Sequence, residues 1–297
     1  MKKIDIHCHM TAFPDYVPGW KNGLRFLCDT EQIEIHDKLN VDKAVILPVI
    51  APDAQWMTMS NQEAKFLADK YPDRFVWFCN VDPRQAEYSK DADLEWIIER
   101  YKSMGAKGLG ELTTPLDADD PMMQNLFAAC ERTNMPVLIH IAPQHGGTYG
   151  IVDEPGLPRI EKMLKKFPNM KMIGHSAAFW CEITDCPEEL RNDYPTGKIE
   201  KDGRLAELLR ECPNLYCDLS AGSGSNAMMR DPEYAAKFLT EFADRIFYGA
   251  DVCNVNNKFQ YVFDEFLTGL VESGKISQET YEKIIRLNAV KLLGLEE

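Results

Sequence analysis

The sequence lacks several features that mark common protein classes. No uninterrupted apolar run approaches the ~20 residues of a transmembrane helix, and no basic leader with an apolar stretch opens the chain. Acidic residues outnumber basic ones by 47 to 33, which gives a formal net charge of -14. This charge disfavours nucleic acid and anionic membrane surfaces as partners. We therefore expect a protein that is neither exported nor membrane-inserted and that acts on a small molecule.

Two kinds of short motif are also missing. The nine cysteines are an odd number and contain no CxxC pair, which predicts reduced thiols in the cytoplasm. No GxGxxG opens a predicted helix and no GxxxxGK[ST] occurs, so the sequence gives no support for a nucleotide-binding fold.

Eight short segments rich in Val, Ile and aromatic residues predict β-strands. They cover residues 4–9, 44–50, 75–82, 106–112, 136–142, 171–177, 215–221 and 246–252. Helical spacing of apolar residues lies between them, for example at residues 94–101 and 205–212, and a helical pattern spans residues 278–293. This alternation over 297 residues predicts an α/β fold, a (β/α)₈ TIM barrel with residues 1–297 as one domain. The alternative is an open, doubly wound sheet.

Long connections follow several predicted strands, at residues 10–29, 51–59, 143–156, 178–202 and 222–230. In a barrel, the loops that follow the strands lie at the C-terminal face, where active sites are built. Side chains suited to a pocket wall occur there: Phe13, Tyr16, Trp20, Arg25, Trp56, His145, Tyr149, Trp180, Tyr194, Asn226 and Arg230.

Polar residues gather at the ends of the predicted strands: His7, His9, Glu111, His140, His175, Asp218, Ser220 and Asp251. His7 and His9 are two residues apart and share a strand face, so both imidazoles can bind one divalent metal. Because the strand ends of a barrel converge on one rim, we expect these separated positions to form one cluster.

Four segments carry a family resemblance. They are Ile4-Asp5-Ile6-His7-Cys8-His9, Pro136-Val137-Leu138-Ile139-His140, Met172-Ile173-Gly174-His175-Ser176 and Arg245-Ile246-Phe247-Tyr248-Gly249-Ala250-Asp251. In this order they resemble the amidohydrolase superfamily. More narrowly, they resemble the amidohydrolase-related branch that includes aminocarboxymuconate-semialdehyde decarboxylase. The resemblance spans nearly the whole chain.

The resemblance implies that His7, His9, His140 and Asp251 hold one divalent ion, Zn²⁺ with Mn²⁺ or Fe²⁺ as alternatives. It also implies that His175 is the catalytic histidine and that the protein is a homodimer. Three imidazoles and one carboxylate suit zinc, which lowers the pKa of bound water to about 7. Asp251 is then also placed to accept the proton of that water.

The fourth strand departs from the pattern of binuclear relatives, which often have a carboxylated lysine there. This chain has Glu111 at the strand end, with Lys107 four residues earlier. We expect Glu111 to be a further metal ligand, a proton shuttle or a substrate contact. The alternative is a structural ion pair between Lys107 and Glu111.

The remaining candidates belong to the loops. Arg230 and Arg25 can bind a substrate carboxylate or be merely solvated. Ser220 and Asn226 lie in a Gly- and Ser-rich segment that either contacts substrate or forms a turn. Further along the chain, Trp180 either walls the pocket or covers core, and His145 either lies over the pocket or is exposed. We expect His36 to be a surface or packing residue, Cys8 to pack in the barrel, and Asp5 to support the histidines by hydrogen bonding.

These residues predict a metal-dependent hydrolase that acts on an amide, lactone or ester of a small molecule. The alternative is a metal-dependent, non-oxidative decarboxylase of a small carboxylic acid, which would use the same metal-binding residues. A third hypothesis is a metal-bearing protein that binds a small molecule without turnover.

Overall fold

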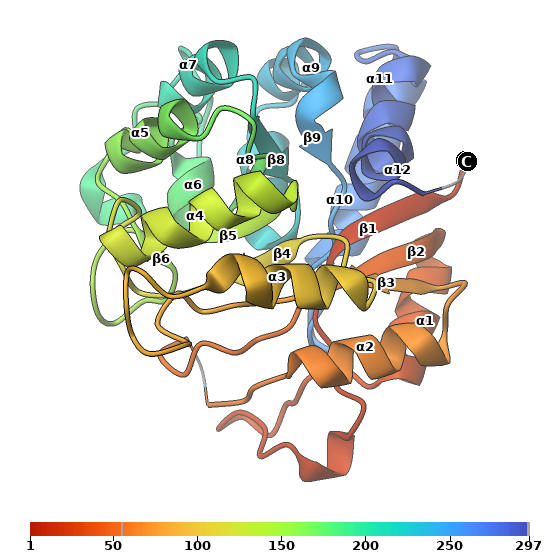
Figure 1. The fold of residues 1–297 in the computed structure, drawn as a ribbon. Coiled ribbons are helices and arrows are strands. Elements are labelled where there is room, and N and C mark those ends of the chain that lie inside the picture. The colour runs from red at the N-terminus through yellow and green to blue at the C-terminus, as the bar shows by residue number, and fades with distance from the viewer. Residues whose placement is uncertain (55, 296–297) are drawn as a thin grey trace.

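Parallel strands form the centre of the molecule, and helices cover them on the outside (Figure 1). The computed structural model describes residues 1–54 and 56–295. Its strands are β1 (Lys3–Cys8), β2 (Val41–Ile46), β3 (Phe75–Trp77), β4 (Leu109–Leu112), β5 (Val137–Ala142), β6 (Ile151–Val152), β7 (Met172–His175), β8 (Leu215–Asp218) and β9 (Ile246–Phe247). Its α-helices are α1 (Asp29–Lys38), α2 (Asn61–Lys70), α3 (Leu94–Ser103), α4 (Pro121–Thr133), α5 (Pro158–Lys166), α6 (Ala177–Cys181), α7 (Arg204–Glu211), α8 (Ala221–Met229), α9 (Pro232–Glu241), α10 (Phe259–Glu272), α11 (Gln278–Glu282) and α12 (Asn288–Leu293).

Backbone hydrogen bonds connect the strands around the barrel. The strand orders are β1-β2-β3 and β4-β5-β7-β8-β9, and all these pairs are parallel. Cys79, just after β3, pairs with Leu109 of β4, which joins the two sheets on one side. On the other side, the Ile6 N–H donates to the Tyr248 carbonyl at 3.1 Å, and the Asp251 N–H donates to the His7 carbonyl at 2.9 Å. The (β/α)₈ TIM-barrel prediction is confirmed.

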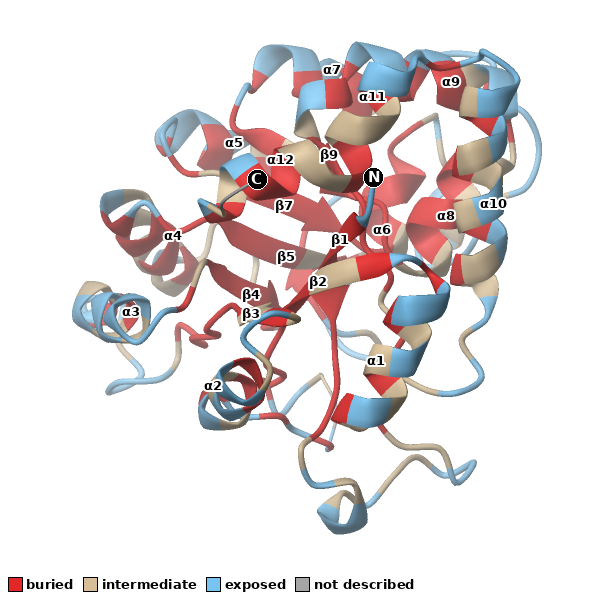
Figure 2. Ribbon diagram, turned by 90° about the vertical axis from the view of Figure 1, so that its right-hand side faces the viewer, coloured by how far each residue is buried: buried red, intermediate tan, exposed pale blue. Residues whose placement is uncertain are grey.

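An apolar core fills the part of the barrel that lies below the polar strand ends. Side chains from successive strands meet there: Ile4, Ile6, Val45, Leu47, Phe78, Leu138, Ile173 and Phe247. Helix α12 adds Ala289, Val290 and Leu293 to the same cluster. Figure 2 shows the strands buried at the centre and the helices with their exposed sides outward. The apolar side chains hold the strand backbones in place, and the strand ends therefore have fixed positions.

Several helices begin at the residue types that favour helix starts. The Ser60 side chain accepts from the Glu63 N–H at the start of α2. Asp120 and Asp231 do the same for α4 and α9, each followed by a proline at the first helical position. These caps satisfy N–H groups that have no partner within the helix.

The structure confirms the eight predicted strands, although most are shorter than expected, and it adds the short strand β6. The helical prediction for residues 278–293 is also confirmed, as α11, a π-helical turn and α12. The prediction of a loop at residues 222–230 was wrong, because residues 222–229 lie in α8 and Arg230 caps its C-terminal end. Gly224 lets the helix approach β8 closely: a Cβ there would lie 2.3 Å from the Leu219 carbonyl oxygen. Packing thus outweighs the weak helix propensity of Gly and Ser. Within the described residues, no helix is both long and apolar enough to span a membrane.

Candidate metal centre

The end of β1 places His7 and His9 inside the barrel rim. His7 is fully buried and His9 nearly so. The His7 N–H donates to the Asp5 carboxylate at 2.9 Å, and Asp5 also accepts from the Ala250 N–H at 2.8 Å. Asp5 therefore ties β1 to the segment after β9, as the sequence predicted for a supporting residue. His36 contacts the same carboxylate and is buried, so of the two alternatives, surface or packing, the structure shows packing.

Three imidazoles are oriented by hydrogen bonds at Nδ1. His7 Nδ1 lies 2.6 Å from Asp218 Oδ2, and His9 Nδ1 lies 2.9 Å from the Leu47 carbonyl oxygen. His175 Nδ1 lies 3.0 Å from Ser220 Oγ, whose hydroxyl donates to Asp218. Each acceptor requires Nδ1 to donate, so the Nε2 atom of each ring is left for a ligand.

Glu111, at the end of β4, lies between two pairs of imidazole rings: His7 with His9, and His140 with His175. Its Oε1 is 2.7 Å from His140 Nδ1 and 3.9 Å from His175 Nε2. Its Oε2 is 3.3 Å from His9 Nε2 and 3.9 Å from His7 Nε2. The carboxylate thus presents one oxygen to each pair. Histidines are its partners, and the alternative of a Lys107–Glu111 ion pair was wrong.

Asp251 follows β9, which is the eighth strand of the barrel because β6 lies outside it. Its carboxylate completes the cluster. Its Oδ1 lies 3.7 Å from His7 Nε2 and 3.9 Å from His9 Nε2. Asp251 has a φ of 49°, and Ser176 beside His175 has a φ of 111°. Positive φ is unfavourable for residues with a Cβ and is often found at functional sites.

The electrostatics of the cluster follow from burial and from its opposite charges. Burial lowers the pKa of His7, but the charges of Asp251 and Asp218 outweigh it and raise the pKa to about 10. Burial raises the pKa of Glu111, yet the charge and hydrogen bond of His140 hold it well below its usual value. The pKa of Asp218 is also lowered, because His7 and His175 outweigh the effect of burial. The Glu111 and Asp218 carboxylates are therefore ionised, and a divalent cation that binds His7 would displace the proton from its Nε2 atom.

The donor set fits a divalent metal. Ligand atoms lie within 4.8 Å of one another in three groups: His7, His9 and Glu111; His7, His175 and Asp218; and Glu111, His140 and His175. Imidazole nitrogens and carboxylate oxygens are the ligands of Zn²⁺, Mn²⁺ and Fe²⁺. The structure thus brings together all the predicted metal and catalytic residues: His7, His9, Glu111, His140, His175 and Asp251.

Two cavities open onto the cluster. One, of about 340 Å³, is lined by His140, His175 and Asp251 together with Tyr149, Asn192 and Tyr194. The other, of about 290 Å³, is lined by His9, Glu111 and Asp251 together with Trp20, Phe26 and Trp56. Asp251 and Tyr149 belong to both. Substrate-sized space therefore lies directly beside the metal-binding side chains.

Two predicted substrate residues lie elsewhere. Arg25 pairs with Glu31 at 2.8 Å, and His145 is exposed and lies 2.8 Å from Asp117. Among the described residues, neither lines a cavity that contains cluster residues. Arg25 bonds to Glu31 because both flank the start of α1, where Glu31 also accepts the Cys28 N–H.

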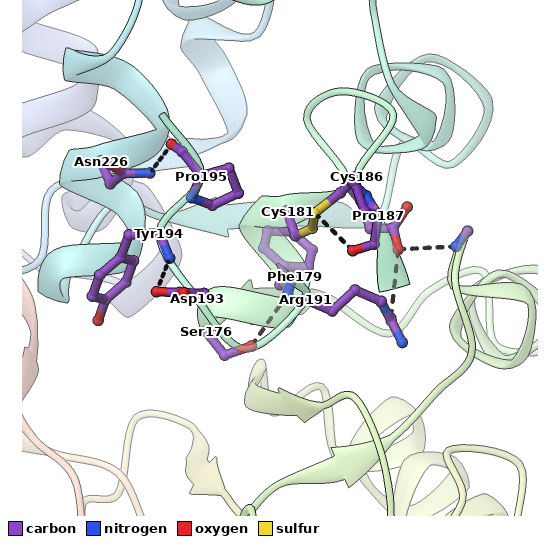
Figure 3. The surroundings of a disulfide bond; sticks show 12 residues. Ser176, Phe179, Cys181, Cys186, Pro187, Arg191, Asp193, Tyr194, Pro195 and Asn226 are labelled. Carbon is purple, nitrogen blue, oxygen red and sulfur yellow. Dashed lines mark hydrogen bonds and ion pairs between the residues drawn. A yellow bond between two sulfur atoms is a disulfide. The ribbon is translucent and has the colours of Figure 1, made fainter. Parts of the chain in front are cut away.

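Three other predicted substrate residues, Trp180, Asn226 and Arg230, line a separate small cavity together with Tyr194. Trp180 is buried and donates to the Asp218 carbonyl at 2.9 Å. Asn226 donates to the Pro195 carbonyl, next to Tyr194 (Figure 3). Arg230 donates to the same carbonyl, so both residues hold the loop that carries Tyr194. Ser220 is buried and reaches the cluster through His175 and Asp218.

A disulfide joins Cys181, the last residue of α6, to Cys186 in the loop that follows, which corrects the expectation that the thiols are reduced. The loop turns back after the helix and brings the two Cα atoms to 5.8 Å apart (Figure 3). The other seven cysteines of the described chain are free, and Cys8 packs in the core as predicted.

Sequence reasoning did not assign a role to Asp218, which holds His7 directly and His175 through Ser220. Its place at a strand end was the available signal. Gly249 leaves the space for it, because a Cβ at this position would lie 2.3 Å from Asp218 Oδ1.

The chain is similar in fold to solved structures across almost its whole length. An uncharacterized TIM-barrel protein from Bordetella bronchiseptica is 17% identical, with a TM-score of 0.66 and 99% of each chain covered. A 5-carboxyvanillate decarboxylase from Novosphingobium aromaticivorans, complexed with manganese, is 17% identical, with a TM-score of 0.62 and coverage of 99% of this chain and 96% of that one. A probable 2-pyrone-4,6-dicarboxylic acid hydrolase from Acinetobacter baumannii is 14% identical, with a TM-score of 0.58 and coverage of 99% and 100%.

No curated protein matches the sequence. A family model does: that of the amidohydrolases aligns with residues 4–295, which include every residue of the cluster. The chain therefore belongs to the amidohydrolase family.

Proposed function

We propose that this protein is a divalent-metal-dependent hydrolase that cleaves an ester, lactone or amide of a small molecule. The observation that carries the proposal is the buried cluster of four histidines and two carboxylates, which lies beside two cavities at the barrel rim. The residues that would hold the metal are His7, His9, His140, Asp251 and Glu111. Their mixed nitrogen and oxygen donors suit Zn²⁺, with Mn²⁺ or Fe²⁺ as alternatives, and manganese is present in one protein of similar fold.

A bound divalent cation supplies polarisation of a carbonyl and acidification of water. The protein supplies the groups that position and accept protons. The Asp251 carboxylate lines both cavities and is placed to accept a proton from the attacking water. His175 lines the larger cavity, and its Nδ1 is held by Ser220, so the ring has a fixed orientation toward developing negative charge.

The charge of the cavity walls favours hydrolysis over decarboxylation. No Lys or Arg lines either cavity in the described part of the chain, so no cationic side chain there is placed to bind a substrate carboxylate. An uncharged ester, lactone or amide enters such a site without a charge penalty. A carboxylic acid substrate would have the metal as its main cationic partner. Decarboxylation remains the second candidate, supported by the likeness of the fold to decarboxylases.

The test is a substrate panel with the zinc- and manganese-loaded protein. Hydrolysis predicts release of an acid with an alcohol or amine, lost in the chelated protein and restored by metal. Release of CO₂ from aromatic acids, without hydrolysis, would overturn the proposal in favour of a decarboxylase. Stoichiometric ligand binding without turnover in both panels would indicate a binding protein. In the active enzyme, His175→Asn should keep bound metal while kcat falls by about 10²-fold or more.

A further inference from the structure

Two cavities open onto the cluster, and two side chains of the described chain line both of them: Asp251 and Tyr149. Asp251 offers a carboxylate, which accepts protons. Tyr149 offers a phenol hydroxyl, which is protonated at neutral pH and can donate a hydrogen bond. A substrate that extends into both cavities passes these two side chains, so its reacting group meets one acceptor and one donor there.

Other hydrogen-bond donors among the described side chains line one cavity only. Asn192 and Tyr194 belong to the larger cavity, and Thr113 belongs to the smaller one. Each of them is placed for one end of a bound substrate. Tyr149 lies where the two ends meet.

The segment between β5 and β6 fixes Tyr149 against His140. The two rings have their centroids 4.4 Å apart and their planes at 35°. The next residue, Gly150, has a φ of 124°, and a Cβ there would lie 2.6 Å from the His140 carbonyl oxygen. The Gly150 N–H also donates to the Thr113 carbonyl at 3.2 Å. This close approach of the backbone, together with the imidazole, holds the phenol ring at the rim of the barrel.

The Tyr149 hydroxyl is free to bind a substrate. It has no hydrogen-bond partner among the described residues, although its neighbours in the same segment do. Thr148 Oγ1 donates to the Gln144 carbonyl at 3.1 Å, and His145 Nε2 lies 2.8 Å from Asp117 Oδ1. The local fold therefore accounts for the position of the Tyr149 ring but gives its hydroxyl no partner.

We propose that Tyr149 is a catalytic hydrogen-bond donor whose phenol binds the carbonyl oxygen of the scissile ester, lactone or amide. This rests on the proposed hydrolase function and adds a residue to it. Negative charge develops on the carbonyl oxygen when water adds to the carbon, and a donor that is already in place stabilises that charge. The hydroxyl keeps its proton, so Asp251 remains the group that accepts the proton of the water.

Two variants separate this role from packing of the ring on His140. Tyr149→Phe keeps the ring and removes only the hydroxyl, whereas Tyr149→Ala removes both. Tyr88→Phe is the matched control, because it removes the same hydroxyl from a tyrosine that is 70% exposed and lines neither cavity.

Binding of acetohydroxamate to the zinc-loaded protein tests the donor without turnover. The two oxygens of this small anion chelate a divalent ion and can also accept a hydrogen bond. Calorimetry should show the same affinity for the wild type and Tyr88→Phe. In Tyr149→Phe, the affinity should fall by about tenfold or more at equal zinc content. A crystal structure of the wild-type complex should place Tyr149 Oη about 2.7 Å from a hydroxamate oxygen.

The inference is overturned if the wild type does not bind acetohydroxamate or if Tyr149→Phe binds it as tightly as the wild type does. In the second case, weak binding by Tyr149→Ala would assign the side chain to packing alone. A loss of zinc from Tyr149→Phe would also overturn it, because the hydroxyl would then support the metal ligands.

Turnover gives a separate readout. With an ester, lactone or amide that the wild type hydrolyses, kcat should fall by about 10²-fold in Tyr149→Phe while KM changes little. Unchanged kcat in this variant would contradict the role of Tyr149 and leave the hydrolase function standing. Failure of the hydrolase function itself is seen in the wild type, as the absence of hydrolysis products.

Discussion

Two histidine–carboxylate pairs in this protein have nearly the same hydrogen-bond distance but very different surroundings. His140 lies 2.7 Å from Glu111, and the two side chains are 15% and 8% exposed. His145 lies 2.8 Å from Asp117, and these side chains are 59% and 38% exposed. The first pair belongs to a buried cluster with three more histidines, whereas the second pair is exposed to solvent and joins two loops. A short contact alone therefore does not identify a functional site.

The two pairs differ in burial and in the number of charged neighbours. Exposed ion pairs contribute roughly 0–1 kcal/mol, because water and salt screen them. In the cluster, water is largely excluded and each charge has several neighbours of opposite sign, so the groups hold one another in defined positions. Replacing single residues in the two regions should separate these cases.

The largest effect is expected for His7→Ala. The variant loses an imidazole that is fixed by Asp218 and that lies 3.0 Å from His9 Nε2, so the ligand set is broken. Bound metal should fall to a small fraction of the wild-type value, as should activity, and Asp251→Ala should behave similarly. Elemental analysis after dialysis measures this, and wild-type zinc content in both variants would contradict the ligand assignment.

A smaller effect is expected for Asp218→Asn. Asp218 does not line the cavities in the described structure, but its carboxylate accepts the hydrogen bond of His7. Loss of such a carboxylate behind a metal-bound histidine typically weakens metal affinity by about 10–100-fold. Competition with a chelating dye gives the affinity of both proteins. If it is unchanged, Asp218 serves folding rather than the metal.

Asp153 provides a third case, a buried carboxylate whose partners are backbone N–H groups and not histidines. It accepts the N–H groups of Glu154, Arg159 and Ile160, and burial raises its pKa from 3.8 to about 6. Between these values the folded state binds more protons than the unfolded state, so this group lowers stability as pH rises from about 4 to 6. The loss amounts to roughly 2–3 kcal/mol. Urea unfolding of wild type and Asp153→Asn across this range should show a shallower decline in the variant; parallel curves would contradict the assignment.

The smallest effect is expected for Asp117→Asn in the exposed pair. Metal content should equal that of the wild type, and the free energy of unfolding should change by no more than about 0.5–1 kcal/mol. Thermal unfolding together with elemental analysis measures both quantities. A loss of metal in this variant would place the loop pair, rather than the strand ends, in the metal site.

The sequence predicted the barrel and the cluster because both depend on regular patterns. Strand periodicity located the eight strands, and the barrel geometry brought His7, Glu111 and Asp251 together although they are far apart in the chain. Loop residues followed no such pattern. Arg25 pairs with Glu31, and Arg230 at the end of α8 donates to the Pro195 carbonyl; both contacts depend on how a loop folds. The helix at residues 221–229 and the disulfide after α6 were missed for the same reason.

The central claim is that the buried strand-end cluster is a metal centre, and anomalous X-ray diffraction from crystals grown with zinc tests it most directly. The account predicts a strong peak at bonding distance, about 2.0–2.2 Å, from the Nε2 atoms of His7 and His9 and from an oxygen of Glu111 or Asp251. A map without a peak at these side chains, or with its strongest peak at His145 and Asp117, would contradict it.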